Sequence, residues 1–158
     1  MNHNGNGTFD LPLAFSGHSI EPRDGVGNYT IVFTFDQTVD SGTASLTGTG
    51  TVSNVTFSGN DMIITLSGVT DQQIVTVTAM NVSGPNTDTL PSASVDIGFL
   101  IADVNGDGVV NVADTIVVRN HAGESLTNSN FEYDLNVDGA INVGDTVVVR
   151  VHSGDFLP

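Results

Sequence analysis

The stretch Asp103–Asp114, DVNGDGVVNVAD, opens a repeat that organises the C-terminal third of the chain. The segment DVNGDGVVNVADTIVVRNHAG (103–123) aligns without gaps on DLNVDGAINVGDTVVVRVHSG (134–154), with thirteen of the twenty-one positions identical. A duplication this strong indicates two copies of one supersecondary unit. We therefore expect the chain to end in two equivalent structural units.

Each copy begins with oxygen-bearing side chains at the spacing of a twelve-residue calcium loop, which supplies ligands from positions 1, 3, 5, 7, 9 and 12. The first copy offers Asp103, Asn105, Asp107, the carbonyl of Val109, Asn111 and Asp114. The second copy offers Asp134, Asn136, Asp138, the carbonyl of Ala140, Asn142 and Asp145. Three carboxylates and several neutral oxygens suit Ca²⁺, whereas Mg²⁺ demands a tight octahedron. The sequence predicts two Ca²⁺ ions.

Other positions of the two loops support this interpretation. Gly108 and Gly139 occupy position 6, where the chain turns sharply in a conformation that glycine adopts at low cost. Val110 and Ile141 fill position 8, the apolar position through which paired loops commonly touch. Position 12 is Asp in both copies, although the EF-hand pattern has Glu there.

The segments behind the loops are rich in β-branched residues, which local propensity alone assigns to strands. Helix-end signals oppose that assignment. Asn111 and Asn142 are candidate N-caps, each with an Asp three residues later, and Gly123 and Gly154 stand where helices end in a left-handed residue. We predict helices of about ten residues that the metal loops impose, since metal binding contributes to folding.

The first hundred residues follow a different pattern, with short runs of alternating apolar and polar residues between turns. In Asn28–Phe35 the alternation places Tyr29, Ile31, Phe33 and Phe35 on one face, as in a half-buried strand. Seven such strands suggest an immunoglobulin-like antiparallel β-sandwich. They are expected near Phe9–Phe15, Asn28–Phe35, Ala44–Thr47, Thr51–Phe57, Met62–Ser67, Ile74–Met80 and Val95–Ile101.

The two patterns meet near Ile101, so we predict a mostly β protein with a sandwich over residues 1–101 and a small α-helical calcium-binding domain over residues 102–158. Pro85–Ser94 has the composition of a linker, but the strand-like Val95–Ile101 runs directly into Asp103. With so little slack, the two modules are expected to pack against each other.

The charge balance excludes several classes of partner. Eighteen acidic residues face three arginines and no lysine, and the net charge of −15 repels nucleic acid and anionic membrane surfaces. The chain lacks cysteine and any long apolar run that could span a membrane. The abundance of Gly, Thr, Ser, Val and Asn is typical of secreted bacterial proteins, found outside the cell or at its surface.

Two loop–helix units that lack the helix before each loop resemble type I dockerin domains, whose motif D-x-N-x-D-G-x-[VI]-N-x-x-D occurs here twice. The resemblance covers Asp103–Gly154, and it explains the Asp at position 12. It implies calcium binding and attachment to a cohesin domain on another extracellular protein, in either of two orientations because the repeats are nearly identical. Loop positions 10 and 11, often Ser–Thr in cellulosomal dockerins, are Val112–Ala113 and Val143–Gly144 here.

The leading hypothesis is a non-catalytic extracellular module for calcium-dependent attachment to a cohesin-like partner. A self-assembling subunit of a filament or surface layer, with copies of itself as partner, is the first alternative. A carbohydrate-binding module is weaker, because Tyr29 and Tyr133 are the only tyrosines and tryptophan is absent. No hydrolase elbow or cysteine nucleophile indicates catalysis.

A few further residues carry weaker expectations. His121 and His152 occupy equivalent repeat positions and suit packing at helix ends. His3 and His18 lie in glycine-rich sequence and give no functional signal. The closing Asp155–Pro158 contains Phe156 and Leu157, which could clasp Phe99 or Leu100 or simply fray.

Overall fold

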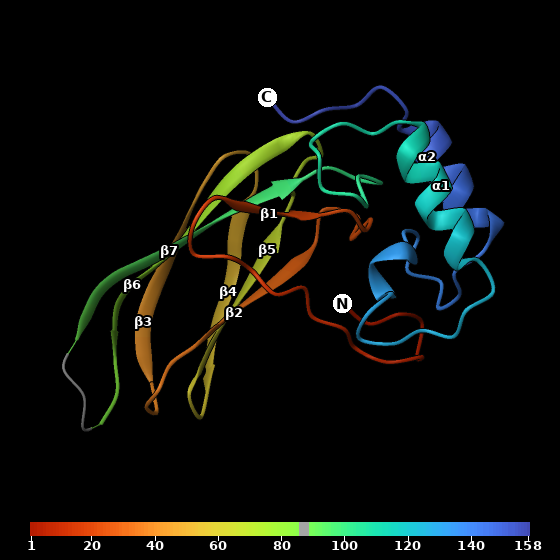
Figure 1. Ribbon diagram of the computed structural model, residues 1–158. Coiled ribbons are helices and arrows are strands. Elements are labelled where there is room, and N and C mark those ends of the chain that lie inside the picture. The colour runs from red at the N-terminus through yellow and green to blue at the C-terminus, as the bar shows by residue number, and fades with distance from the viewer. Residues whose placement is uncertain (86–88) are drawn as a thin grey trace.

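The computed structural model describes residues 1–85 and 89–158, which form a β-sandwich followed by a small helical unit (Figure 1). The strands are β1 (His18–Glu21), β2 (Tyr29–Thr34), β3 (Ser41–Thr47), β4 (Thr51–Ser58), β5 (Asp61–Ser67), β6 (Gln73–Ser83) and β7 (Leu90–Phe99). The helical unit contains α1 (Val112–His121), a short 3₁₀ turn η1 (Phe131–Tyr133) and α2 (Val143–Val151). The predicted fold class, mostly β with a small helical C-terminal part, is confirmed.

The strand order is that of an immunoglobulin-like sandwich. One sheet has the order β2-β5-β4 and the other β1-β7-β6-β3. These groupings correspond to the B-E-D and C-F-G strands of an immunoglobulin domain, with the first strand paired to the last. All pairs are antiparallel except β1 with β7, which run parallel. The predicted antiparallel sandwich is present, and the parallel pairing of β1 with β7 is an addition to it.

The core lies between the two sheets and follows the alternation in the sequence. In β2, Tyr29, Ile31 and Phe33 are buried, and the residues between them are exposed. They belong to one apolar cluster with the inward residues of β5, β6 and β7, such as Ile64 and Val77. A half-buried strand requires this period of two, since successive side chains point to opposite faces.

The predicted strand at Phe9–Phe15 does not form. This segment has no regular structure and lines a cavity of about 520 Å³ beside β2. Pro12 lies at its centre and lacks the N–H that a strand would use for pairing. The first strand is instead His18–Glu21, which pairs with Asp96–Phe99, the last four residues of β7.

The chain passes from sandwich to helical unit without a linker. Within the predicted linker Pro85–Ser94, positions 86–88 lie outside the described residues, and β7 already begins at Leu90. Leu100 is fully buried in a second apolar cluster together with residues of the helical unit, and Ile20 of β1 packs against that cluster. Ala102 turns the chain with φ +76° while its N–H donates to the carbonyl of Pro22 at 2.8 Å.

Candidate metal centres

The first loop directs both of its terminal carboxylates inward. Asp103 and Asp114 are almost completely buried. Oδ2 of Asp103 accepts the N–H of Gly108 at 2.8 Å, and Oδ1 of Asp114 accepts those of Val104 and Asn105 at 3.1 and 3.2 Å. The backbone of the loop therefore wraps around the carboxylates of positions 1 and 12, Asp103 and Asp114.

The intermediate positions are held by short side-chain to backbone hydrogen bonds. Oδ1 of Asn105 accepts the N–H of Asp107 at 2.8 Å, and Oδ1 of Asp107 accepts that of Val109 at 3.0 Å. The amide of Asn111 donates to the carbonyl of Val109 at 3.1 Å. The six predicted oxygen donors thus belong to one compact loop, each in a fixed local conformation.

The second loop repeats this arrangement. Asp134 and Asp145 are fully buried. Oδ2 of Asp134 accepts the N–H of Gly139 at 2.9 Å, and Oδ1 of Asp145 accepts that of Leu135 at 2.8 Å. The remaining candidates pair as in the first copy, with Asn136 accepting from Asp138, Asp138 from Ala140, and Asn142 donating to Ala140.

The backbone conformations explain the glycines and reveal one difference between the loops. Gly108 and Gly139 at position 6 have φ values of +85° and +94°, so the sharp turn expected there is present. Position 4 is also left-handed, with Gly106 at φ +71° but Val137 at φ +56°. A β-branched residue in this region is strained, and the second loop holds it nonetheless.

Both helices begin at the residues that the sequence indicated. Asn111 and Asn142 are N-caps whose side chains accept the N–H of the second helical residue at 2.8 and 2.7 Å. Asp114 and Asp145 return the contact by accepting the N–H of the cap residue, each at 2.8 Å. These two carboxylates therefore serve the loop and the capping box at once, which couples loop closure to the helix start.

The electrostatics of the loops favour a cation. Burial raises the pKa of Asp103, and the negative charges of Asp114 and Asp107 raise it further. Burial likewise raises the pKa of Asp145, with a contribution from Asp134. The loops offer only oxygen ligands, among them buried carboxylates that repel one another, and this set fits Ca²⁺. Zinc prefers nitrogen and sulfur ligands, which the loops do not offer.

The two copies interlock through the residues that follow the helices. The N–H of Gly123 donates to the carbonyl of Ile141 at 2.8 Å, and the N–H of Gly154 donates to that of Val110 at 2.9 Å. The position-8 residue of each repeat thus pairs with the glycine that follows the helix of the other repeat. The two hydrogen bonds are related by an approximate twofold axis. The left-handed conformation expected at both glycines is present, with φ +89° and +103°.

The C-terminal tail lies against the first loop. The N–H of Leu157 donates to the carbonyl of Gly108 at 3.0 Å, and its side chain packs against the cluster that contains Leu100. Phe156 forms a bridge with Val109 but leaves more than half of its surface exposed. The apolar side chain of the predicted clasp is therefore that of Leu157, whereas Phe156 contributes its backbone and leaves its side chain largely exposed.

The histidines differ most from the expectations. His121 stacks on Tyr133 with ring centroids 4.2 Å apart, and Nδ1 of His152 lies 3.0 Å from Asp155 and 3.4 Å from Asp71 of the β5–β6 turn. His3 is fully buried, with Nδ1 2.7 Å from Oδ2 of Asp134. The expectation that His3 is uninformative is wrong, and no local pattern signals a contact that spans 131 residues.

Comparison with known proteins agrees with this geometry. Residues 101–152 match the family model of the dockerin type I domain. The match spans about a third of the chain and includes both loops and both helices. Dockerin domains are non-catalytic modules that bind calcium and attach to a protein partner. The sandwich lies outside the match.

Searches of curated proteins and of solved structures returned no match. Among the described residues, no helix is long and apolar enough to cross a membrane.

Proposed function

We propose that residues 102–158 are a dockerin module that binds two Ca²⁺ ions and attaches the chain to a protein partner, and that residues 1–101 are the sandwich that the module carries. The ligands of the first ion would be Asp103, Asn105, Asp107, the carbonyl of Val109, Asn111 and Asp114. Those of the second would be Asp134, Asn136, Asp138, the carbonyl of Ala140, Asn142 and Asp145. The observation that carries this proposal is the duplicated loop with two buried, inward-facing carboxylates in each copy.

The attachment surface would be the exposed face of the two helices. α1 and α2 pack side by side (Figure 1). Each exposes apolar residues, and two on each helix stand at equivalent positions of the repeats. These residues are Val112 and Ile116 on α1, and Val143, Val147 and Val151 on α2. Exposed valines and isoleucines that recur along one helix face, unlike scattered ones, favour a protein interface.

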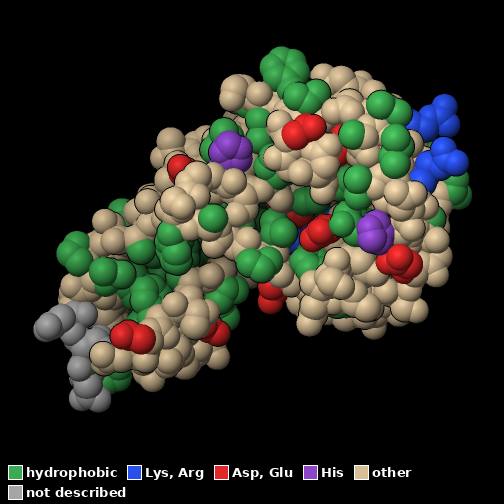
Figure 2. All heavy atoms as spheres, viewed as in Figure 1, with side chains coloured by type: hydrophobic (Ala, Val, Ile, Leu, Met, Phe, Trp, Pro, Cys, Tyr) green, Lys and Arg blue, Asp and Glu red, His purple; other side chains and the backbone are tan. Residues whose placement is uncertain are grey.

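Arginines border this apolar face. Arg119 and Arg150 line a shallow pocket between the helices with Thr115 and Thr146. Figure 2 shows the exposed basic side chains together at one end of the molecule, whereas acidic side chains are spread over the rest of the visible surface. A partner with an acidic rim around an apolar patch would complement this face.

The partner is proposed to be a cohesin-like domain of another extracellular or cell-surface protein in a bacterium. Val112–Ala113 and Val143–Gly144 replace the polar pair that often faces cohesins, so the partner would present an apolar counterpart. Because the two helices expose equivalent residues, the partner could dock in either of two orientations related by the approximate twofold.

The carbohydrate-binding alternative loses support from the positions of the tyrosines. Tyr29 is buried in the sandwich core, and Tyr133 is stacked on His121. The ring of Tyr29 is closed to a sugar and one face of the Tyr133 ring is occupied by His121, whereas such modules use free aromatic faces for stacking.

A binding experiment with matched variants tests the proposal. Immobilised cohesin domains are exposed to the full chain in calcium and in EDTA, with Ile116→Glu, Val147→Glu and the double variant. Each single variant should retain binding through the other orientation, whereas the double variant should lose it. Val32→Glu on the exposed face of β2 is the control and should bind normally.

The same samples separate the alternatives. Calcium-dependent binding that the double variant abolishes supports the proposal. Absence of binding to any cohesin, together with calcium-induced growth in size during gel filtration, would replace it with self-assembly. Absence of calcium binding in a titration would overturn it altogether.

A further inference from the structure

The N-terminal residues fold into a small closed turn. Asn2 and Thr8 form an antiparallel bridge, and the N–H of His3 donates to the carbonyl of Gly7 at 2.9 Å. The N–H of Asn6 donates back to the carbonyl of His3, also at 2.9 Å. We refer to residues 2–9 as the N-terminal strap.

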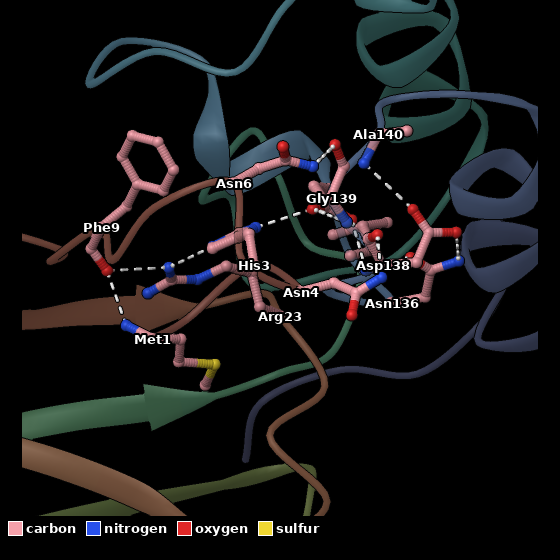
Figure 3. A network of polar contacts seen from close by, with 12 residues as sticks. Met1, His3, Asn4, Asn6, Phe9, Arg23, Asn136, Asp138, Gly139 and Ala140 are labelled. Carbon is pink, nitrogen blue, oxygen red and sulfur yellow. Dashed lines mark hydrogen bonds and ion pairs between the residues drawn. The ribbon is translucent and has the colours of Figure 1, made fainter.

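The strap lies on the second loop, more than a hundred residues away in the chain (Figure 3). The side-chain amides of Asn4 and Asn6 donate to the carbonyls of Asp138 and Gly139 at 3.1 and 3.0 Å. The fit is tight, since a Cβ added to Gly139 would collide with the Asn6 side chain. Positions 5 and 6 of the loop are therefore covered by the strap.

His3 extends this contact into the buried part of the loop. Its Nδ1 lies 2.7 Å from Oδ2 of Asp134, and its Nε2 lies 3.2 Å from Nη1 of Arg23. Because a guanidinium only donates hydrogen bonds, Nε2 must accept and Nδ1 must carry the proton. The ring therefore donates Nδ1–H to the position-1 carboxylate, and both residues are fully buried.

The sandwich holds His3 in place. Arg23 is buried and makes a bidentate pair with Glu21 of β1, at 2.7 and 2.6 Å. The guanidinium also lies 4.8 Å from the ring centroid of Phe131, on which Phe9 of the strap stacks. A continuous buried chain, Glu21–Arg23–His3–Asp134, thus joins the sandwich to the second loop.

The first loop has no such support. Oδ2 of Asp103 accepts the N–H of Gly108, as Oδ2 of Asp134 accepts that of Gly139, but no side chain among the described residues takes the place of His3 there. The two loops carry the same residue types at all five side-chain ligand positions, so the extra support of Asp134 does not come from a different set of ligands.

We infer that His3 is a positioning residue for the second calcium site, which is completed by the sandwich module. Resting on the calcium binding proposed above, the inference is that His3 fixes the orientation of the Asp134 carboxylate before the ion arrives. Hydrogen bonds to ligating carboxylates change metal affinity by about 10–100-fold. Linkage requires that calcium at this loop strengthens strap docking by the same factor.

Calorimetric calcium titration of the full chain tests this inference. The two sites are separated by disabling one loop at a time, with Asp107→Ala for the first and Asp138→Ala for the second. With only the second site left, His3→Ala should weaken calcium binding by about 10–100-fold. With only the first site left, the same substitution should have no effect. His18→Ala, an exposed histidine on β1, is the matched control.

Further readouts distinguish positioning from general stability. His3→Gln keeps a side-chain donor and should recover part of the affinity. Hydrogen exchange in residues 2–9 should slow on calcium addition in the wild type. Should His3→Ala fail to fold, the exposed pair Asn4→Ala and Asn6→Ala weakens the strap without touching the core, and it should lower second-site affinity alone.

The possible failures are distinct. A wild type that binds no calcium refutes the proposed function itself. If the wild type binds two calcium ions and His3→Ala leaves the affinity of the second site unchanged, only the role of His3 is refuted. Tighter second-site binding in His3→Ala would show that the strap competes with the ion, which also refutes the inference.

Discussion

At the scale of single residues, identical side chains acquire different roles from their surroundings. Asp103 and Asp134 occupy the same position of the same motif, yet only Asp134 receives a hydrogen bond from another module. Asp114 and Asp145 each combine two tasks, since one carboxylate closes the loop and caps the helix. Substitution of such a residue would remove both contributions together, so their effects cannot be separated by mutation alone.

Asp71 provides a pH-dependent prediction at this scale. Burial raises the pKa of Asp71 above its usual value of 3.8, while the N–H of Ile101 partly opposes the shift. A carboxyl whose pKa is higher in the folded state stabilises the fold below the unfolded value, and this contribution is lost as pH rises through the folded value. Asp71→Asn should therefore gain stability relative to the wild type as pH rises from below 3.8 to neutral.

Urea unfolding of both proteins in the same calcium concentration, followed across this pH range, measures the difference. Asp36→Asn, the same substitution at an exposed site, is the control. If the difference in unfolding free energy between Asp71→Asn and the wild type did not change with pH, neighbouring groups would fully offset the cost of burying the ionised Asp71 carboxylate.

At the scale of elements, the sequence predicted most features that depend on local chemistry. Alternation located β2 to β6 to within three residues and β7 without its first five residues, and the Asn and Gly signals located both helices despite their β-branched interiors. The other failures involve distant partners. Phe9–Phe15 alternates as well as any strand, but pairing was decided by β7, far along the chain. The contact of the strap with the second loop could not be predicted for the same reason, since its partners are far apart in the sequence.

The helices give a prediction for metal removal. α1 and α2 contain runs of Ile and Val that disfavour helix, and their first turns depend on carboxylates that also close the loops. In EDTA those carboxylates repel one another, so loop and helix should be lost together. Far-ultraviolet circular dichroism should show a fall in helical signal in EDTA and its return with excess calcium. Equal helicity in both conditions would show that the helices do not depend on the ion.

At the scale of the whole molecule, the two modules meet in a shared apolar cluster. Leu100 leaves β7 and enters the cluster of the helical unit, where Ile20 of β1 and Leu157 of the tail join it. The strap closes the opposite side through His3 and Asp134. Contacts on both sides would restrict rotation of the attachment face relative to the sandwich, which a flexible linker would not do.

Leu100 gives the test of this coupling. Leu100→Ala in calcium should lower the free energy of unfolding by about 2–5 kcal/mol, as expected for a fully buried leucine. In EDTA, with the helical unit unfolded, the same substitution should cost much less, because the cavity no longer exists in the remaining fold. Leu66→Ala, equally buried but inside the sandwich, should cost the same in both conditions. Calorimetry in calcium and in EDTA measures all four values, and an equal cost for Leu100→Ala in the two conditions would show that calcium does not govern the joint.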